Sequence, residues 1–403
     1  MLLGWLRAAV TAALVIGIAA CAGQSAAGNL AAPVPNDSAH ATLADSAFAP
    51  KRGGQIRPTG RFYHGLSYGS ESQFNPLTVV VNEGWDMLRL NDNRDVLSRP
   101  YATGFRSMGF TLTHPVDVVR KYGFTRWLRN EVFPLTFRSN GGGHGGGGQW
   151  EPNYQLHLFG SGMTYIRTAE WYEANGVPHP RLFASATLFA GHLMNEVIEN
   201  GAFCCENEDS FTDLMVFDPL GMVLWNQDWM QRTFSGRVEM TNWYGQPMFR
   251  PADNRLDNAF SLYMLRVPVP KTDNWKLMTT GGNVFLLGLS RRVGTLWVSA
   301  AGGLVPSSNP VTDSITNQKT VGVEPNVGLF IDRNGSLLAS ILTGTGIWNG
   351  PTLNVYPDVI AHGPLSPGFF VQWATGGPDH RGLRFGVSSK LGIGLGKMSR
   401  ARQ

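Results

Sequence analysis

The chain has 403 residues and a formal net charge of +4, and charged residues make up only 15% of it. This length suits one large domain or two moderate ones. Few charges, 49 glycines and 11% aromatic residues are untypical of a cytosolic helical enzyme and favour a β-rich, partly lipid-facing protein.

The first 21 residues have the pattern of an export signal. Arg7 supplies a positive charge, an apolar run extends from Ala8 to Ile18, and Ile18-Ala19-Ala20-Cys21 follows. The run is too short to cross a bilayer about 30 Å thick, which needs roughly 20 residues. The last four residues resemble the lipobox cut by the lipoprotein signal peptidase. We therefore expect Cys21 to be acylated and to anchor the chain in the outer membrane through lipid.

Residues 22–56 are rich in Ala, Ser, Gly, Pro and Asn and nearly lack aromatic residues. Such a segment cannot bury enough apolar surface to offset the conformational entropy lost on folding. We interpret it as a tether that lets the folded part lie about 30 Å from its anchor.

Residues 57–217 are predicted to be mainly helical. A short helix is expected near Asn82–Leu88, and a longer one at Val116–Phe133, where Pro115 suits the first turn. The basic residues between Arg120 and Arg129 alternate with apolar ones, like the solvated face of a helix, so we expect no nucleic-acid partner. The glycine run 141–148 lacks the Lys-Ser or Lys-Thr of a phosphate-binding loop and is predicted to be a surface loop.

Two helices after this loop are predicted to form an antiparallel hairpin. The first extends from Asn153 to about Glu173 and ends at Ala174-Asn175-Gly176. The second extends from about Pro180 to Glu199. The connection between them is only a few residues long, which is typical of a helical hairpin.

Cys204 and Cys205 are the only cysteines besides Cys21. Because they are adjacent in the sequence, they can pair with each other only through a strained ring. A vicinal disulfide and two separate thiols are both open. No His or Lys lies close in sequence to activate either thiol.

Residues 218–403 change to an alternation of period two, which is typical of strands. Arg384–Lys397 places Phe385, Val387 and other apolar residues on one face and small or cationic residues on the other. Val321–Ile331 repeats this pattern, and Leu296–Ala300 and Phe285–Leu289 give weaker versions. We predict an α+β protein whose C-terminal part is an antiparallel β-barrel of about eight to ten strands.

Two interpretations of these strands remain open, because alternation does not tell the outside of a barrel from its inside. In one, the apolar face contacts the outer membrane and glycines fill a narrow lumen. In the other, a soluble barrel turns its apolar face inward. The glycine-rich second face favours the membrane barrel. The last residues, Lys397–Gln403, lack the terminal aromatic residue of many such barrels and favour the soluble form.

The predicted hairpin concentrates ionisable residues. His192, Glu196 and Glu199 have the spacing of one helical face, with Asn195 beside them. His157 and Glu170 lie on the first helix and would approach this face if the helices pack antiparallel. The set is compatible with a His–carboxylate acid/base pair or with metal ligation, although the second His of a His-Glu-x-x-His helix is missing.

A buried polar network is the third interpretation of these residues, for example with Arg167 bonded to Glu196 or Glu199. No cofactor is expected. Gly160-Ser161-Gly162 lies in a helical pattern and does not fit the strand-to-helix turn of a hydrolase nucleophile. Asp209, Asp213 and Asp218 lack the spacing of a calcium loop.

Several segments together resemble a family of bacterial envelope proteins. They are Trp150–Glu173, Asn195-Glu196 with Glu199, Asp213-Leu214 with Phe217-Asp218, and Asn354–Pro357. The resemblance covers most of the chain after about Asn75. It implies a helical segment followed by a barrel-like half, and it carries no activity over to this chain.

Two functions follow as hypotheses. The favoured one is an outer-membrane lipoprotein whose helices dock on or plug the barrel, in a structural, assembly or binding role with membrane lipid and other envelope proteins as partners. The alternative is an envelope hydrolase acting on lipid or cell-wall material with the His/Glu residues of the hairpin.

Overall fold

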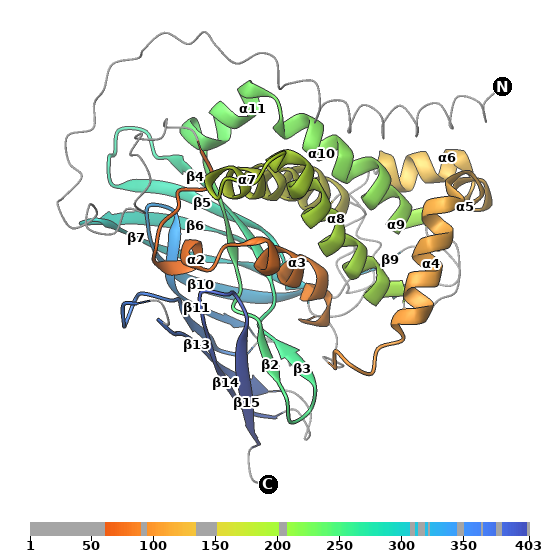
Figure 1. The fold of residues 1–403 in the computed structure, drawn as a ribbon. Coiled ribbons are helices and arrows are strands. Elements are labelled where there is room, and N and C mark those ends of the chain that lie inside the picture. Colours follow the sequence, from red (N-terminus) through yellow and green to blue (C-terminus); the bar gives the residue numbers. More distant parts are fainter. Residues whose placement is uncertain are drawn as a thin grey trace.

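A computed structural model of the chain places most of it in two groups of elements, helices and one large sheet (Figure 1). It describes residues 61–89, 95–133, 151–200, 208–306, 311–312, 319–320, 323–344, 350–363, 366–375 and 381–400. Four predictions lie outside these residues: the signal with Cys21, the tether 22–56, the glycine run 141–148, and the state of Cys204 and Cys205.

The helices occupy the first half of the described chain. The helical elements are α2 (Gly69–Ser72), α3 (Pro76–Trp85), η3 (Asp86–Arg89), α4 (Tyr101–Thr113), α5 (Pro115–Tyr122), α6 (Phe124–Trp127), η4 (Leu128–Val132), η5 (Glu151–Gly160), α7 (Ser161–Ala174), α8 (Pro180–Glu199), α9 (Glu208–Thr212), η7 (Asp213–Phe217), α10 (Asp218–Trp225), α11 (Asp228–Arg232) and η8 (Thr233–Arg237). None of the helices described here is long and apolar enough to cross a bilayer. Helical structure continues beyond Asp218, and the first strand begins only at Glu239.

The predicted helical hairpin is confirmed. Its first arm consists of the π-helix η5 continued by α7, and its second arm is α8, which begins at Pro180 and ends at Glu199. Pro180 occupies the first turn, where a missing N–H costs nothing. The single helix expected at Val116–Phe133 is wrong, because Gly123 adopts a φ of +98° and separates α5 from α6.

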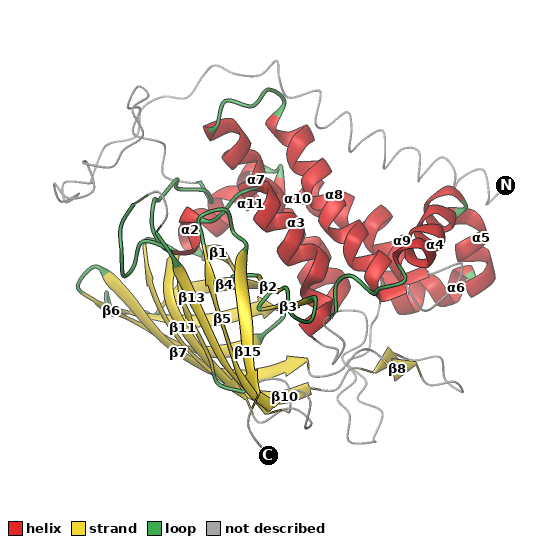
Figure 2. Cartoon of the chain, turned by 60° about the horizontal axis from the view of Figure 1, so that its bottom comes forward, coloured by secondary structure: helices red, strands yellow, loops and turns green. Residues whose placement is uncertain are grey.

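The strands form one large sheet (Figure 2). They are β1 (Glu239–Tyr244), β2 (Met248–Arg250), β3 (Arg255–Asp257), β4 (Ser261–Pro268), β5 (Trp275–Gly282), β6 (Phe285–Val293), β7 (Leu296–Pro306), β10 (Val323–Arg333), β11 (Ser336–Gly344), β12 (Thr352–Val355), β13 (Gly368–Thr375), β14 (Arg381–Ser388) and β15 (Gly394–Arg400). A separate pair consists of β8 (Val311–Thr312) and β9 (Lys319–Thr320). The α+β class predicted from the sequence is therefore confirmed.

The predicted number of strands is wrong, and the described strands do not close into a barrel. The sheet has 13 strands in the order β1-β4-β5-β6-β7-β10-β11-β12-β13-β14-β15-β2-β3, so that β1 and β3 are its edges. It is mixed, because β15 pairs with β2 in parallel. Part of the excess has a simple cause: Arg384–Lys397 is not one strand but parts of β14 and β15, which pair with Phe385 opposite Lys397. The short strands β2 and β3 are too brief to show alternation.

The hairpin from β10 to β11 illustrates how the local sequence sets the register. Asn334 and Gly335 have φ values of +53° and +80°. Two consecutive residues with positive φ make the tight turn that matches the twist of paired strands, and Asn-Gly is the preferred sequence for it. Asn334 and Gly335 therefore form the turn between β10 and β11, and Arg333 pairs with Ser336 across it.

The apolar face of the long strands points away from the sheet's interior. In β10, Val327 and Leu329 are 56% and 51% exposed, whereas Asn326, Phe330 and Asp332 are buried. In β14, Phe385 and Val387 are likewise exposed, and Arg384, Gly386 and Ser388 are buried. This is the orientation expected by the membrane interpretation, and it is the reverse of that expected for a soluble barrel.

Polar side chains and an apolar cluster lie together on the buried face of the sheet. Arg266 and Asp332 form a fully buried ion pair, and the guanidinium also donates to the hydroxyls of Ser290 and Ser299 at 2.9 Å each. Trp243 and Phe330 belong to the adjoining apolar cluster. The bonds to two hydroxyls and a carboxylate satisfy the buried guanidinium, which would otherwise be costly in this setting.

The helices and the sheet share a hydrophobic core. Met163 and Ile166 of α7, Leu188 of α8 and Trp225 of α10 pack with Tyr263 of β4. The helices gather on one side of the sheet in both views (Figures 1 and 2). This shared core fixes the position of the helical hairpin relative to the strands.

Candidate functional site

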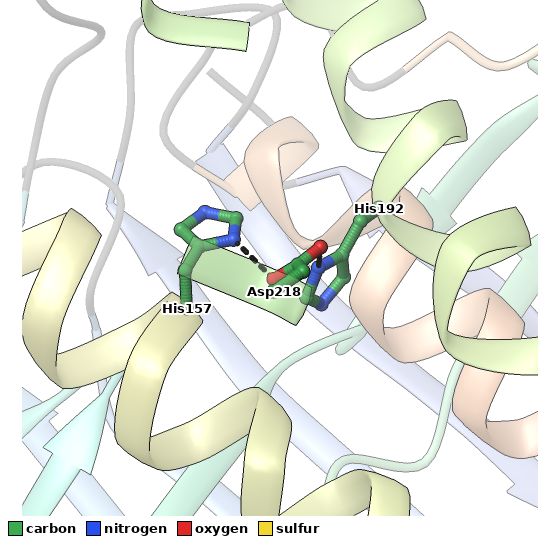
Figure 3. Close-up of side chains that lie close together, drawn as sticks. All are labelled: His157, His192 and Asp218. Carbon is green, nitrogen blue, oxygen red and sulfur yellow. Dashed lines mark hydrogen bonds and ion pairs between the residues drawn. The ribbon is translucent and has the colours of Figure 1, made fainter. Parts of the chain in front are cut away.

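The main cluster of ionisable side chains lies where three helical elements meet (Figure 3). His157 comes from η5, His192 from α8 and Asp218 from the start of α10. Asp218 lies between the two imidazoles: its Oδ1 is 2.9 Å from His157 Nδ1, and its Oδ2 is 2.6 Å from His192 Nδ1. One carboxylate therefore orients both rings, whose centres are 5.0 Å apart.

Each imidazole has a second carboxylate near its other nitrogen. His157 Nε2 lies 3.5 Å from Asp213 Oδ2, and His192 Nε2 lies 3.9 Å from Glu83 Oε2. The result is a series of alternating acids and imidazoles, in the order Asp213, His157, Asp218, His192 and Glu83. Glu83 also accepts a hydrogen bond from Tyr244 Oη of β1 at 2.7 Å. This series of side chains therefore connects the helices to the sheet.

Burial and mutual attraction have opposite effects on the pKa values of His192 and Asp218. Burial opposes a charge on His192, but the carboxylates of Asp218 and Glu83 together outweigh it and raise the pKa of His192 well above its ordinary value. Burial likewise opposes ionisation of Asp218, yet the two imidazoles lower the pKa of this carboxyl. At neutral pH the pair is therefore an imidazolium and a carboxylate.

Glu196 joins this cluster, as the sequence predicted. Its carboxylate accepts hydrogen bonds from Ser210 Oγ at 2.5 Å and from Asn200 Nδ2 at 3.5 Å. Burial and the charges of Glu199, Asp213 and Asp209 raise its pKa well above the ordinary value. One ligand atom each of His157, Glu196 and Asp213 lies within 4.8 Å of the others, and the same holds for His157, His192 and Asp218. His157 and Glu196 are thus close enough to share a site.

Glu199 and Asn195 take supporting positions. Glu199 is the last residue of α8 and is half-buried, and its charge acts on Glu196. Asn195 donates from Nδ2 to Asp86 Oδ1 at 2.7 Å, so it holds η3 against α8.

Glu170 does not belong to the cluster, contrary to the expected convergence with His157. Its Oε2 accepts backbone N–H groups from Phe62 at 2.8 Å and Tyr63 at 2.7 Å, which fastens the segment before α2 to α7. The expected bond from Arg167 to Glu196 or Glu199 is also wrong. Arg167 instead forms a buried ion pair with Glu71 at 2.5 Å and donates to the Asn242 carbonyl.

We predict that Glu170→Gln abolishes a loss of folding stability that the wild-type protein shows as the pH rises. Burial is the main cause that raises the pKa of Glu170 from 4.5 to about 7. The folded state then holds a proton that the unfolded state releases, so wild-type stability falls between pH 4.5 and about 7 and levels off above. At about 1.4 kcal/mol per pH unit, the difference amounts to roughly 3 kcal/mol.

The measurement is the free energy of unfolding of both proteins at pH 4.5, 6 and 8. Glutamine keeps the acceptor oxygen for Phe62 and Tyr63 but does not titrate. The variant should therefore gain stability relative to wild type as the pH rises. Parallel curves for the two proteins would contradict this assignment.

Ser161, His192 and Asp218 are arranged like a Ser-His-Asp triad, but the Ser161 hydroxyl is unsuited to nucleophilic attack. Its Oγ is 3.5 Å from His192 Nε2, at the limit of a hydrogen bond. The hydroxyl donates to the Leu156 carbonyl at 3.0 Å, and Ser161 is 1% exposed inside a helical arm. A substrate could reach this oxygen only by displacing the helices. The sequence-based rejection of a hydrolase elbow here agrees with the geometry.

Sequence reasoning missed the roles of Asp218, Asp213 and Glu83. Asp213 begins the π-helix η7 and Asp218 follows it, so the two acids that approach His157 are five positions apart. A π-helix closes its turns with hydrogen bonds between residues five apart. No pattern in the sequence marked this wider turn, so spacing rules for an α-helix did not connect the two residues.

Comparisons with family models, curated proteins and solved structures give no match to this chain. The resemblance to a family of bacterial envelope proteins therefore stays a prediction. The proposals below depend on the geometry of the chain itself.

Proposed function

We propose that this protein is an outer-membrane lipoprotein whose strands form a membrane-embedded barrel. The observation on which the proposal mainly rests is the apolar outer face of the strands. Its exposed members include Leu277, Phe285, Leu287, Leu289, Val298, Leu304, Val327, Leu329, Ile331, Ile341, Leu353, Trp373, Phe385, Val387 and Leu395. Large exposed apolar surfaces are rare on soluble monomers and mark contact with lipid or protein.

The interior supports the same proposal. Buried inward-facing side chains include Arg266, Asp332 and Arg384, together with amides and hydroxyls of neighbouring strands. An arrangement with polar groups inside and aliphatic groups outside reverses that of a water-soluble sheet protein. In a bilayer the arrangement is favourable, because acyl chains solvate the outer face and the polar groups satisfy one another inside.

The length of the four longest described strands fits a bilayer as well. β7 and β10 have 11 residues each, and β6 and β11 have 9. A tilted strand needs about 9–11 residues to cross the hydrocarbon core. Within this proposal the 13-strand sheet closes on itself in the membrane, because an open edge in lipid would leave backbone groups without hydrogen bonds.

Acylation of Cys21 would give a second attachment. The helices would then dock against the barrel through the shared core of Met163, Trp225 and Tyr263. This assembly would have a structural, assembly or binding role, with membrane lipid as its partner and other envelope proteins as candidates. The proposal places the protein in the outer membrane.

The test separates the lipid anchor from the barrel. In cells that produce the Cys21→Ser variant, the mature protein should still fractionate with outer membranes and resist extraction by alkaline carbonate. The barrel alone would hold it there. Release of the variant into the soluble periplasmic fraction would overturn the membrane barrel and leave a tethered soluble domain.

An envelope hydrolase is the second candidate function, and one observation favours it. His157, His192 and Glu196 converge with Asp213 and Asp218, so acids and bases lie within reach of one another. Such pairs can serve general acid–base catalysis. The burial of His192 and Asp218 favours a structural role instead, and the stability measurement described first in the Discussion distinguishes the two.

A further inference from the structure

We infer that His157, Asp213 and Glu196 form a binding site for a divalent first-row transition-metal ion, with Asp218 holding His157 in the ligating orientation. The site lies between η5, η7 and α8. The inference does not depend on the proposed function, since it concerns the helices and not the outer face of the strands.

The distances suit a metal ion. One ligand atom from each of the three residues lies within 4.8 Å of the other two, and His157 Nε2 is 3.5 Å from Asp213 Oδ2. Zinc binds nitrogen and oxygen at about 2.0–2.2 Å in tetrahedral sites, which places neighbouring ligand atoms about 3.4 Å apart. The 3.5 Å separation of His157 Nε2 and Asp213 Oδ2 already matches this value, and a ligand atom of Glu196 lies within 4.8 Å of a ligand atom of each.

The tautomer of His157 supports ligation by Nε2. Its Nδ1 lies 2.9 Å from Asp218 Oδ1, and a proton on Nδ1 makes this contact a hydrogen bond to the carboxylate. A neutral ring bonded in this way carries its lone pair on Nε2, which faces Asp213. Metal-ligating histidines commonly donate their other N–H to a carboxylate in this manner. A cation between Nε2 and Asp213 Oδ2 would be bound by both atoms.

Burial and charge point the same way. Asp213 and Glu196 are 4% and 3% exposed, and their ligand atoms lie within 4.8 Å of each other and of a nitrogen of His157. Buried carboxylates are costly unless they are paired or coordinate a metal. Ser210 Oγ donates to Glu196 at 2.5 Å and would fix that carboxylate in place, as outer-shell partners do at metal sites.

The alternative set of His157, His192 and Asp218 fits less well. Both imidazoles already contact Asp218 through Nδ1, at 2.9 and 2.6 Å, so an ion there would break two charge-assisted hydrogen bonds. The set with Asp213 and Glu196 keeps both bonds. One imidazole and two carboxylates favour zinc, iron, cobalt or manganese over calcium and magnesium, which prefer oxygen ligands alone.

The experiment uses the full chain, purified in detergent, stripped with a chelator and dialysed against Co²⁺ or Zn²⁺ alone. We expect one ion per chain by elemental analysis, and the visible absorption bands of Co²⁺ bound to nitrogen and oxygen. His157→Gln should abolish this stoichiometric binding, as should the nearly isosteric variants Asp213→Asn and Glu196→Gln. Asp218→Asn should weaken it about 10- to 100-fold.

His179→Gln is the matched control, because His179 is exposed at the start of α8 and lies outside the cluster. It should bind one ion as wild type does. Circular dichroism checks the fold of each variant. Wild-type protein without stoichiometric metal would overturn the inference, as would equal binding by His157→Gln. A strong thiolate-to-cobalt band would do the same, because it would place the ion on cysteine sulfur.

Discussion

Replacement of His192 by alanine is expected to lower the free energy of unfolding by about 3–5 kcal/mol. His192 is 5% exposed, and its Nδ1 lies 2.6 Å from Asp218 Oδ2. Removing the imidazolium leaves the buried Asp218 carboxylate with one imidazole contact in place of two, that of His157 Nδ1 at 2.9 Å. It also leaves a cavity beside Ser161 and Glu83, which adds to the loss.

The measurement is denaturant unfolding followed by tryptophan fluorescence, with His179→Ala as the control. His179 is exposed, so its replacement should change stability by no more than about 0.5 kcal/mol. A loss of several kcal/mol for His192→Ala would assign this histidine to the structural network. A change below about 1 kcal/mol would instead favour the hydrolase alternative, in which His192 acts as a general acid or base.

An arginine in place of Leu329 is expected to destabilise the membrane-inserted protein by about 2–4 kcal/mol. Leu329 lies near the middle of β10 and is 51% exposed on the apolar outer face. In water, an exposed leucine can be exchanged for arginine at little cost. In the hydrocarbon core the guanidinium loses its hydration, and the cost is greatest at the midplane. The loss of stability therefore shows whether water or lipid surrounds this face.

Equilibrium unfolding in phosphatidylcholine vesicles measures this effect. Leu182→Arg is the matched control, because Leu182 is 56% exposed on α8, among the helices. We expect Leu182→Arg to stay within about 0.5 kcal/mol of wild type while Leu329→Arg falls well below it. Equal stabilities for the two variants would contradict a lipid-facing sheet.

The helical hairpin and the division of each long strand into two faces could be predicted because their signals are local. Pro180 at a helix start and Asn175-Gly176 at a helix end mark boundaries through the backbone conformation of single residues. Alternation in β10 assigns each side chain to a face, because successive residues of a strand point in opposite directions.

Errors arose where two structures share one local pattern. Arg384–Lys397 alternates without interruption, yet the chain reverses between β14 and β15. A turn whose residues continue the alternation is invisible to periodicity. The break at Gly123 was missed for a related reason: a glycine is tolerated within a helix, and only its φ of +98° shows that the helix ends there.

The candidate site was predicted only in part. His192 and Glu196 share a face of one helix, and the hairpin brings His157 to them, so these three followed from spacing and one packing assumption. Glu170 was misplaced because it lies about 13 Å along the same arm from Ser161, at a rise of about 1.5 Å per residue. Helical direction alone did not show that the segment at Phe62 would bind it.

The sequence by itself determined the α+β class, the helical hairpin and the division of each long strand into an apolar and a polar face, because backbone preferences and side-chain periodicity act over a few residues. The tertiary structure alone decided which face is exposed, and which acids surround His157 and His192. Asp218 and Glu83 reach the imidazoles from helices far apart in the chain. Contacts of that kind depend on how whole elements pack, and no local pattern records them.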